Sequence, residues 1–449
     1  KDTIQGFSCQ KITYNIFSNT YEVWYTQQVT VNGSPSISLV PSKGLVLKYV
    51  INGNREVRAK NIRATHEQIE LPSINYYKVN DAEYAAQQIK SRYTVIPILN
   101  HHQINYENLP SHMIKHMELV EHYSKGNILL SHVKLPNQPS KGSYFLKLTD
   151  WSNGDAYDRV GSVFLMMNDK PKSFVNALIQ NIDSVPFYTD KNSAKYQGIM
   201  ATKTYSPAVE LMRFFTPFGV GHFNKKRIIA GYNWSDSVIY KQDVTALIPT
   251  DAEFITIGVY IGNYDKGGHK VSLELDFYPE PEMPESKKYI QPLFNTVPLM
   301  EVEGQNYGKL FLTDTLKMNF EIPDSLENLQ LLYTTTGHGG WGNGDEFNPK
   351  LNEIFMDGKP LFAITPWRTD CATYRLHNPS SGNFPDGLSS SDLSRSNWCP
   401  GTLTPPFIIP INKISKGKHV LQVAINQGKN EGTNFSHWCV TGVLVGNKK

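Results

Sequence analysis

The feature that most limits the fold of this chain is a series of short apolar segments, each bounded by turn residues. Between about residues 123 and 283 they include GSYFLKL, VGSVFLMM and EFITIGVYIG, and the same texture returns later in LQLLYTTTG, HVLQVAI and CVTGVLVG. Short segments rich in β-branched and aromatic residues at this spacing are typical of antiparallel sheets packed as sandwiches. We therefore expect a mainly β chain with two sandwiches in tandem.

A break between the two β regions is indicated by YPEPEMPESKK (278–288), which has three prolines and several charges. A chain of 449 residues is also too long for one ordinary core. We expect three domains: an N-terminal domain at 1–122, a first sandwich at 123–283 and a second sandwich at 284–449.

The N-terminal part has a mixed pattern. The residues around Asn52-Gly53 predict a β-hairpin, because this dipeptide suits the tight turn between two strands. Residues 80–93, with Asp81 near their start, and residues 110–126, which end at Gly126, have helical periodicity. We expect a smaller α+β domain here.

The composition excludes several classes of protein. With 44 basic and 41 acidic residues the net charge is +3, and no Lys/Arg run could follow a phosphate backbone, so we expect no nucleic-acid partner. No apolar stretch reaches ~18 residues, so we expect no membrane span. Because the sequence opens at Lys1 without Met, we expect a processed or trimmed secreted protein.

Four cysteines allow three full pairings, among which the sequence alone does not choose. Cys371 and Cys399 flank a loop rich in Ser, Gly, Asn and Pro. A disulfide across this loop would stabilise the folded chain by about 3 kcal/mol, because it limits the freedom of the unfolded chain. We expect this bridge, and with it an oxidising compartment. For Cys9 and Cys439 both a second bridge and buried free thiols stay open.

An unusual cluster of polar residues precedes the apolar segment VGSVFLMM. Asp155, Tyr157, Asp158 and Arg159 lie within five residues in WSNGDAYDR, whereas a turn alone needs only Asn153-Gly154. Taken alone, Asp158 is more often a turn acceptor than a catalytic group.

The second β region has two comparable clusters. The glycine-rich segment GHGGWGNGDEFNP carries His338, Trp341 and Glu346, and SRSNWCPG carries Arg395 and Trp398. Two carboxylates that face each other across a groove can divide acid and base roles if their pKa values differ. The alternatives are a turn acceptor for Glu346 and a salt bridge or loop anchor for Arg395.

Histidines give no firm metal motif. His112 and His116 have i, i+4 spacing on the helix expected at 110–126, with His101-His102 upstream, but a solvated helix face explains this spacing better. His338 has no partners at metal spacing nearby in the sequence. We expect neither a metal nor a cofactor.

Several motifs together resemble the peptide-N-glycosidase F family. DAYDRVGSVF is similar to the family's strand-opening motif, and RFFTPFGVG to the next strands of its first sandwich. TTTGHGGWG, the glutamate of GDEF and SRSNWCPG follow in the family's order. The resemblance covers about 123–449, and 1–122 is similar to an extra N-terminal domain of longer members.

The resemblance implies two tandem eight-stranded antiparallel jelly rolls with the active site at their junction. Asp158 matches the essential aspartate, Arg159 and Arg395 match site arginines, and Glu346 matches the glutamate of the second sandwich. We count all four as catalytic. The expected substrate-binding residues are Asp155, Tyr157, His338, Trp341, Trp398 and Asn263.

The implied activity is hydrolysis of the amide between asparagine and the first GlcNAc of N-glycans, in a secreted, periplasmic or cell-surface bacterial protein. N-glycoproteins and glycopeptides would be the substrates, no metal would be required, and we expect a monomer. An endoglycosidase with the same acid pair and a glycan-binding protein without chemistry are the alternatives.

The sequence also departs from the family pattern. A glutamate and a tryptophan of the best-known member fall at about Ile261 and Asn263, with Gly262 between them, and a small disulfide before the catalytic aspartate is missing. A smaller, less charged wall predicts that a core α1,3-fucose on the first GlcNAc is tolerated. The alternative is that Asp265 fills the same space.

Overall fold

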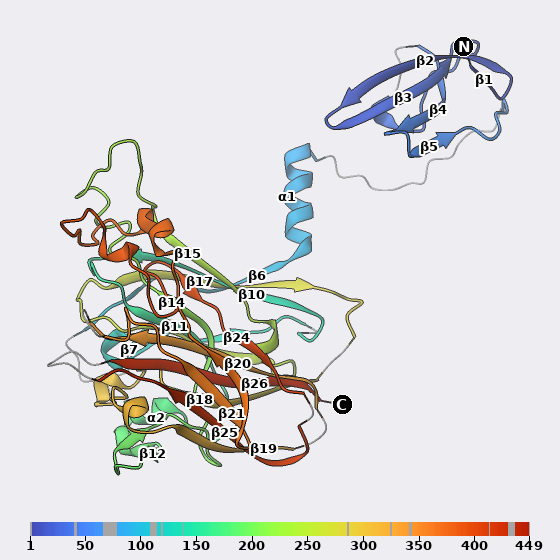
Figure 1. Cartoon of the computed structure of the whole chain (residues 1–449). Coiled ribbons are helices and arrows are strands. Elements are labelled where there is room, and N and C mark those ends of the chain that lie inside the picture. The colour runs from blue at the N-terminus through green and yellow to red at the C-terminus, as the bar shows by residue number, and fades with distance from the viewer. Residues whose placement is uncertain are drawn as a thin grey trace. The chain divides into compact units, whose positions relative to one another are not determined.

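The computed structural model describes residues 2–39, 43–65, 79–107, 115–117, 120–137, 139–284, 287–323, 326–340, 344–412, 414–429 and 436–448. The chain forms two compact units, Lys1–Val79 and Asn80–Lys449. Six β-sheets make up most of the regular structure of the described residues (Figure 1). The mainly β fold expected from the sequence is confirmed.

The N-terminal unit contains one five-stranded sheet in the order β1-β2-β3-β4-β5. Its strands are β1 (Asp2–Ile4), β2 (Phe7–Ile16), β3 (Asn19–Thr26), β4 (Leu45–Ile51) and β5 (Arg55–Arg58). The hairpin between β4 and β5 turns at Asn52 and Gly53, as predicted. Both have positive φ, of 53° and 70°, a conformation that Asn and Gly adopt most readily.

One of the two predicted helices is present. Helix α1 (Asp81–Arg92) begins with a capping box between Asn80 and Glu83 and belongs to the larger unit. The helix expected at 110–126 is wrong over its described part, because β7 (Lys115–Met117) and β8 (Val120–Tyr123) form a sheet edge there. Positive φ values at Lys125 and Gly126 also rule out a continuous right-handed helix. His112 lies outside the described residues.

The first sandwich packs a four-stranded sheet against a seven-stranded sheet. The smaller sheet has the order β15 (Val238–Asp243), β10 (Gly142–Ser152), β17 (His269–Pro279), β6 (Thr94–Ile104). The larger sheet has the order β23 (Leu403–Thr404), β14 (Val209–Phe215), β11 (Val160–Met166), β16 (Phe254–Ile261), β9 (Ile128–Lys134), β8, β7. The sandwich therefore has more than the eight strands expected.

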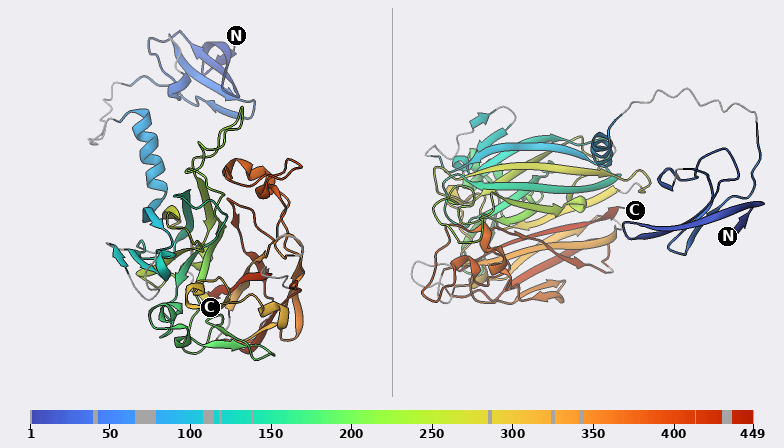
Figure 2. Two further views of the ribbon diagram at one scale, coloured as in Figure 1. Left: turned by 90° about the vertical axis from the view of Figure 1, so that its left-hand side faces the viewer. Right: turned by 90° about the horizontal axis from the view of Figure 1, so that it is seen from above.

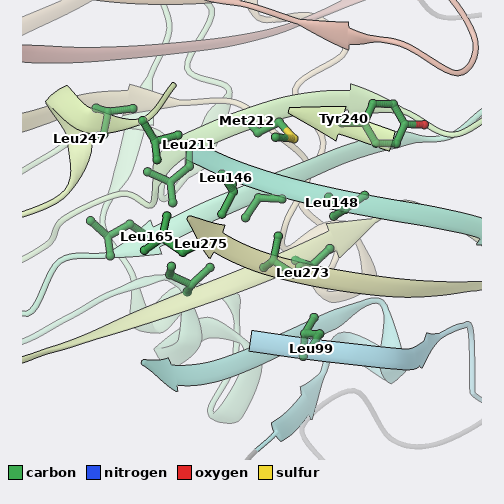
Figure 3. Close-up of a cluster of buried hydrophobic side chains, with 14 of the residues drawn as sticks. Leu99, Leu146, Leu148, Leu165, Leu211, Met212, Tyr240, Leu247, Leu273 and Leu275 are labelled. Carbon is green, nitrogen blue, oxygen red and sulfur yellow. The ribbon is translucent and has the colours of Figure 1, made fainter. Parts of the chain in front are cut away.

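The first sandwich also begins earlier than expected. Strand β6 pairs with β17 from Thr94 to Ile104, so the boundary at residue 122 would cut through this sheet. Leucines from β6, β10, β11, β14 and β17 fill the space between the sheets, as Figure 3 shows for Leu99, Leu146, Leu165, Leu211 and Leu273. Fully buried and partly buried residues alternate along β10, which explains its alternating pattern of side chains.

The second sandwich has two four-stranded sheets, with the eight strands expected. One has the order β18 (Lys287–Asn295), β26 (His437–Lys448), β20 (Leu326–His338), β24 (Phe407–Pro410). The other has the order β19 (Leu316–Ile322), β25 (Gly417–Ile425), β21 (Asn352–Met356), β22 (Lys359–Ile364). Between the main strands lie α2 (Phe174–Ile179), α3 (Leu310–Thr313) and the pair β12 (Phe187–Thr189) and β13 (Lys195–Gln197).

The two sandwiches lie side by side (Figure 2) and are joined by a buried polar network. On β14, Nε and Nη2 of Arg213 donate to both oxygens of Glu210 at 2.6 and 2.8 Å. Nη1 of Arg213 also donates to Oγ1 of Thr336 at 2.9 Å, and Oγ1 of Thr441 donates to Oε2 of Glu210 at 2.7 Å. Strand β23, from the second half of the chain, completes the junction by pairing with β14.

Candidate active site

Asp158 lies in the loop between β10 and β11, at one end of the first sandwich. The carboxylate of Asp155 holds this loop: it accepts from Nε and Nη2 of Arg159 at 2.8 and 3.2 Å and from N of Tyr157 at 3.1 Å. N of Arg159 donates to Oγ1 of Thr216 at 2.8 Å. The backbone is thus anchored immediately before and after Asp158.

Glu346 and Arg395 come from two loops of the second sandwich. N of Ser396 donates to O of Glu346 at 2.9 Å, which ties the two loops together. Arg395 and Arg368 also exchange backbone hydrogen bonds of 2.8 and 3.1 Å. These backbone hydrogen bonds pair donors and acceptors of neighbouring loops and hold the loops together.

The guanidinium of Arg395 lies between the two carboxylates. Its Nε is 2.9 Å from Oε1 of Glu346, and its Nη2 is 3.7 Å from Oδ2 of Asp158. The side chain of Arg395 is 1% exposed, whereas those of Asp158 and Glu346 are 17% and 18% exposed. Because the carboxylates are the more accessible groups, they are better placed than Arg395 to meet a substrate.

Both carboxyls have raised pKa values. Burial raises the pKa of Asp158 to about 6 and that of Glu346 to about 7, while the charge of Arg395 opposes both shifts. The charge of Asp158 raises the pKa of Glu346 further. Near neutral pH the pair can therefore hold a proton on one member while the other is ionised, as general acid–base catalysis requires.

These groups border a cavity of about 520 Å³ at the junction of the sandwiches, a volume within the range of small-molecule sites. Tyr157, 62% exposed, presents an aromatic ring there. The other lining residues include Phe218, Phe347, Ser380, Asn383, Phe384 and Ser390.

A second cavity of about 520 Å³ lies beside the first, and Gly340 borders both. Its lining includes Glu301, Gln305 and Asn306, with the rings of Tyr260 and Tyr307. Burial raises the pKa of Glu301, and a hydrogen bond from Tyr264 and the charge of Arg159 oppose this shift. Amides, a carboxyl and aromatic rings together offer hydrogen bonds and stacking faces to a polar ligand.

Three residues expected to bind substrate are buried instead. Asp155 is 1% exposed and its oxygens serve Arg159 and Tyr157. Trp398, 3% exposed, stacks on Phe215 at 4.1 Å and donates from Nε1 to O of Gly337 at 3.0 Å, and the guanidinium of Arg395 lies 4.9 Å from its ring. These two residues hold the site in place rather than line it.

The third is Asn263, whereas His338 is half-buried. The Nε2 atom of His338 lies 2.9 Å from Oγ1 of Thr336, and Asn263 is 0% exposed. Trp341 lies outside the described residues. Of the expected substrate-binding set, Tyr157 is the residue that the described structure places on the cavity surface.

The expected wall of Ile261 and Asn263 is also wrong, since both side chains are fully buried. Strand β16 ends at Ile261, whose side chain joins the core of the first sandwich. Gly262 instead borders the second cavity. Asp265 does not take the place of the family's glutamate and tryptophan at this cavity. Its Oδ1 instead accepts hydrogen bonds from N of Gly267 and Gly268 at 2.7 and 3.0 Å.

The predicted disulfide between Cys371 and Cys399 is present, with a Cα–Cα distance of 5.1 Å. It closes the segment that carries Ser380, Ser390 and Arg395. Cys9 and Cys439 are buried free thiols, so a second bridge between them does not form.

One group of the described residues has metal-ligand types close together: His338, His437 and Cys439, whose ligand atoms lie within 4.8 Å of one another. Burial raises the pKa of the Cys439 thiol to about 12, although metal binding needs the thiolate. Burial also lowers the pKa of His338, whose Nε2 already contacts Thr336. We assign no metal to this group.

Sequence reasoning missed several residues of the site. Phe347 directly follows Glu346, and Ser380 and Phe384 lie in the disulfide-bounded loop, so proximity to recognised motifs could have found them. The sequence around Glu301 and around His269 contains no motif that indicates a role in the site. Only tertiary packing of segments far apart in the sequence brings them near Arg159.

At the junction of the two β-sandwiches, two carboxyls of raised pKa contact one buried arginine. This combination is typical of a hydrolase active site. The chain belongs to the peptide-N-glycosidase F family. The families described as Peptide-N-glycosidase F, N terminal and C terminal match residues 95–277 and 306–445, and the family described as N-glycanase peptide, N-terminal domain matches residues 1–84. The chain is therefore a peptide-N-glycosidase in the general sense of this family.

Solved structures agree with this assignment. A structure of PNGF-II is 44% identical with a TM-score of 0.85, covering 100% of this chain and 82% of that one. PNGase F, a glycosylasparaginase from Flavobacterium meningosepticum, is 16% identical with a TM-score of 0.53, covering 79% of this chain and 96% of that one, which shows the fold alone. A search of curated protein sequences found no match.

Proposed function

We propose that this protein hydrolyses the amide between asparagine and the first GlcNAc of an N-glycan, leaving aspartate on the peptide and releasing the intact glycan. The observation that carries the proposal is the Asp158–Arg395–Glu346 arrangement, with both carboxyls bordering one cavity and both pKa values raised. Near neutral pH this arrangement supplies an ionised Asp158 that can accept a proton and a protonated Glu346 that can donate a hydrogen bond.

The reaction adds one water across the amide. The water oxygen bonds to the carbonyl carbon as the C–N bond breaks, one water proton ends on the leaving nitrogen, and the second leaves the new carboxyl. The products are an aspartate and a glycosylamine, which loses ammonia in water. Since an amine leaves poorly as an anion, the nitrogen must be protonated during bond cleavage.

Each site residue has a role in this proposal. Asp158 accepts the proton of the attacking water and delivers it to the leaving nitrogen. Glu346 binds the first GlcNAc, to which its protonated form can donate a hydrogen bond. Arg395 holds the two carboxyls at a fixed separation and offsets their charge, and Arg159 keeps the Asp158 loop in place. Tyr157 offers a stacking face to the sugar.

The glycan would extend from the catalytic cavity into the second cavity. Gly340 borders both, and Val160, two residues after Asp158, lines the second. Glu301 is then the carboxyl of the second cavity that faces the glycan. A carboxyl can accept hydrogen bonds from two sugar hydroxyls, so Glu301 is a candidate for recognition of the glycan.

We also infer that core α1,3-fucosylated glycans are accepted. The support is Gly262: it borders the second cavity without a side chain, while Ile261 and Asn263 point away. Removing a clash permits binding without any new attraction. Glycan release is compared for two glycopeptides that differ only in this fucose, and complete resistance of the fucosylated one would refute the inference.

The setting of the enzyme is proposed on similar grounds. The Cys371–Cys399 disulfide fits an oxidising compartment, and we propose a bacterial protein, secreted or held in the periplasm or at the cell surface, that acts as a monomer. Within the described residues, every helix is too short or too polar to cross a membrane.

The mass of a defined glycopeptide after treatment, in water labelled with heavy oxygen, tests the proposal. Aspartate carrying the label at the former asparagine supports the amidase. One GlcNAc left on the peptide would make the protein an endoglycosidase, and an unchanged but bound glycopeptide would make it a glycan-binding protein. Asp158→Asn should give no product, whereas the exposed Asp251→Asn should match the wild type.

A further inference from the structure

A row of buried ionisable side chains leads from the interior of the first sandwich to the catalytic loop. Nδ1 of His269, at the start of β17, lies 2.9 Å from Oδ1 of Asp150 on β10. Nε2 of the same ring lies 4.0 Å from Oδ2 of Asp155, and that oxygen accepts from Nε of Arg159 at 2.8 Å. Asp158 directly precedes Arg159, so the row ends at the proposed proton acceptor.

These groups alternate in charge. Burial lowers the pKa of His269, because it disfavours the charged ring. The charges of Asp150 and then of Asp155 raise this pKa by more, so the net shift is upward. When the His269 ring is protonated, the order is Asp150 negative, His269 positive, Asp155 negative, Arg159 positive. Each charge is thus compensated by its neighbours, although the side chains of Asp150 and His269 are 0% exposed and that of Asp155 is 1% exposed.

Local backbone geometry fixes the row to the catalytic loop. His269 pairs with Ser152 in the β10–β17 ladder. O of Gly268 accepts from N of Asn153 at 2.8 Å and from N of Asp155 at 3.3 Å. The strand that carries His269 therefore also holds the loop that carries Asp155.

We propose that His269 is a positioning residue for catalysis: its charge fixes Asp155, Asp155 fixes the guanidinium of Arg159, and Arg159 places Asp158 at the scissile amide. This inference rests on the proposed function. Stability alone gives no reason to bury three ionised groups, because apolar residues of similar size are often equally stable there. Placement of a reacting group within a fraction of an ångström does give a reason.

Other ionisable groups around the row do not compensate for its loss. The phenol of Tyr240, on β15, faces Asp150, and burial raises the pKa of Tyr240 well above its usual value. On β6 the residue opposite His269 is Ile104, which cannot titrate. Asp150, Asp155 and Arg159 are thus the charged groups that act on the ring.

The test is His269→Asn, because Asn can still donate to Asp150 but carries no charge. We expect kcat on a glycopeptide to fall by about 10- to 100-fold with KM changed less than about twofold, the cost of a small displacement at the reacting centre. If Arg159 moves away from Asp158 in this variant, the pKa of Asp158 should rise, because the charge of Arg159 lowers it in the wild type. The acid limb of kcat/KM should therefore move to higher pH. His419→Asn is the matched control, because it removes a His–carboxylate pair, with Asp357 at 2.7 Å, in the second sandwich.

An active wild type with an unchanged kcat in His269→Asn would overturn the inference, as would an equal loss in His419→Asn. If His269→Asn does not fold, Asp150→Asn replaces it with the same expected loss of kcat, and wild-type kcat in that variant overturns the inference. A wild type that releases no glycan refutes the proposed function itself, and the positioning role with it.

Discussion

Nε of Arg395 donates to Oε1 of Glu346 at 2.9 Å across 49 positions of the sequence. Both residues belong to loops of the second sandwich, whereas Asp158, 3.7 Å from the same guanidinium, belongs to the first. The site is therefore complete only when the two sandwiches are packed together. This dependence gives the buried Arg213–Glu210 network at the junction a functional consequence as well as a structural one.

Arg395→Lys should lower kcat by about 100-fold or more, comparable to the loss of one positioned donor in other active sites. A lysine keeps the charge but has one nitrogen, so it cannot contact Glu346 and Asp158 as the planar guanidinium does. Steady-state kinetics on a glycopeptide measure the effect, with the exposed Arg92→Lys on α1 as control. If Arg395→Lys has the wild-type kcat, the simultaneous contact of the guanidinium with Glu346 and Asp158 is not needed for catalysis.

The acid limb of kcat/KM should have an apparent pKa of about 6. Asp158 must be ionised to accept a proton, and burial raises its pKa to that value. Activity therefore falls as the pH drops through 6, instead of near 4 as for an unperturbed aspartate. A pH profile of glycopeptide cleavage measures this limb, and a limb near 4 would contradict the proposed environment of Asp158.

Asp158→Asn should abolish glycan release and still raise the Tm at pH 8. A carboxyl whose pKa is higher in the folded than in the unfolded chain favours folding at low pH, and this contribution is lost as pH rises through the folded value of about 6. Removing the charge thus stabilises the fold at pH 8, and the gain should shrink towards pH 4. Thermal melts at both pH values measure it, and a Tm lowered at pH 8 would contradict the unfavourable burial of this charge.

Much of the fold was accessible from the sequence because it depends on local patterns. Alternating apolar residues predicted strands such as β10, and the Asn52-Gly53 pair predicted its hairpin. The segment at 115–126 was misread because short apolar runs fit a helix face and a sheet edge equally well. The strand is decided by its place in the sheet: β8 pairs with β9, and β9 pairs with β16, which is more than 100 residues away in the sequence.

The site was accessible only where chemistry is concentrated in short motifs, as around Asp158 and Arg395. The sequence could not show which side chains face the cavity, because a residue in a loop or beside a strand end can point into the cavity or into the core. Trp398, in the disulfide-bounded loop, and Asn263, just after β16, are both buried. Glu301 and His269 come near Arg159 only through tertiary packing.

Glu346→Gln should reduce activity less than Asp158→Asn, by about 10-fold, mainly through a higher KM. Gln keeps the size and hydrogen bonding of Glu346 but not its charge, so the contact with Nε of Arg395 weakens without leaving a cavity. Separate measurement of kcat and KM distinguishes binding from chemistry. An inactive Glu346→Gln enzyme with unchanged KM would move Glu346 into the proton-transfer role.

Replacing both Cys371 and Cys399 by Ser should destabilise the fold by roughly 3 to 4 kcal/mol, the loop-closure entropy for a separation of 28 residues. Activity should fall more steeply with temperature than in the wild type, because the bridge closes the loop that carries Arg395. Chemical denaturation and activity between 20 and 45 °C measure the two effects. Peptide mapping without reductant should find the two cysteines linked, and free thiols at both would refute the bridge.

A chain that begins at Asn80 should fold and cleave short glycopeptides at a rate close to that of the whole protein. Every proposed catalytic residue lies in Asn80–Lys449, which forms one compact unit, and Asn80 keeps the capping box of α1. A chain that begins at residue 123 should instead be insoluble or unstable, because it lacks β6 and leaves one edge of β17 unpaired. Solubility, Tm and kcat/KM of the two truncated chains test this difference. A folded but inactive 80–449 chain would place a required residue in Lys1–Val79.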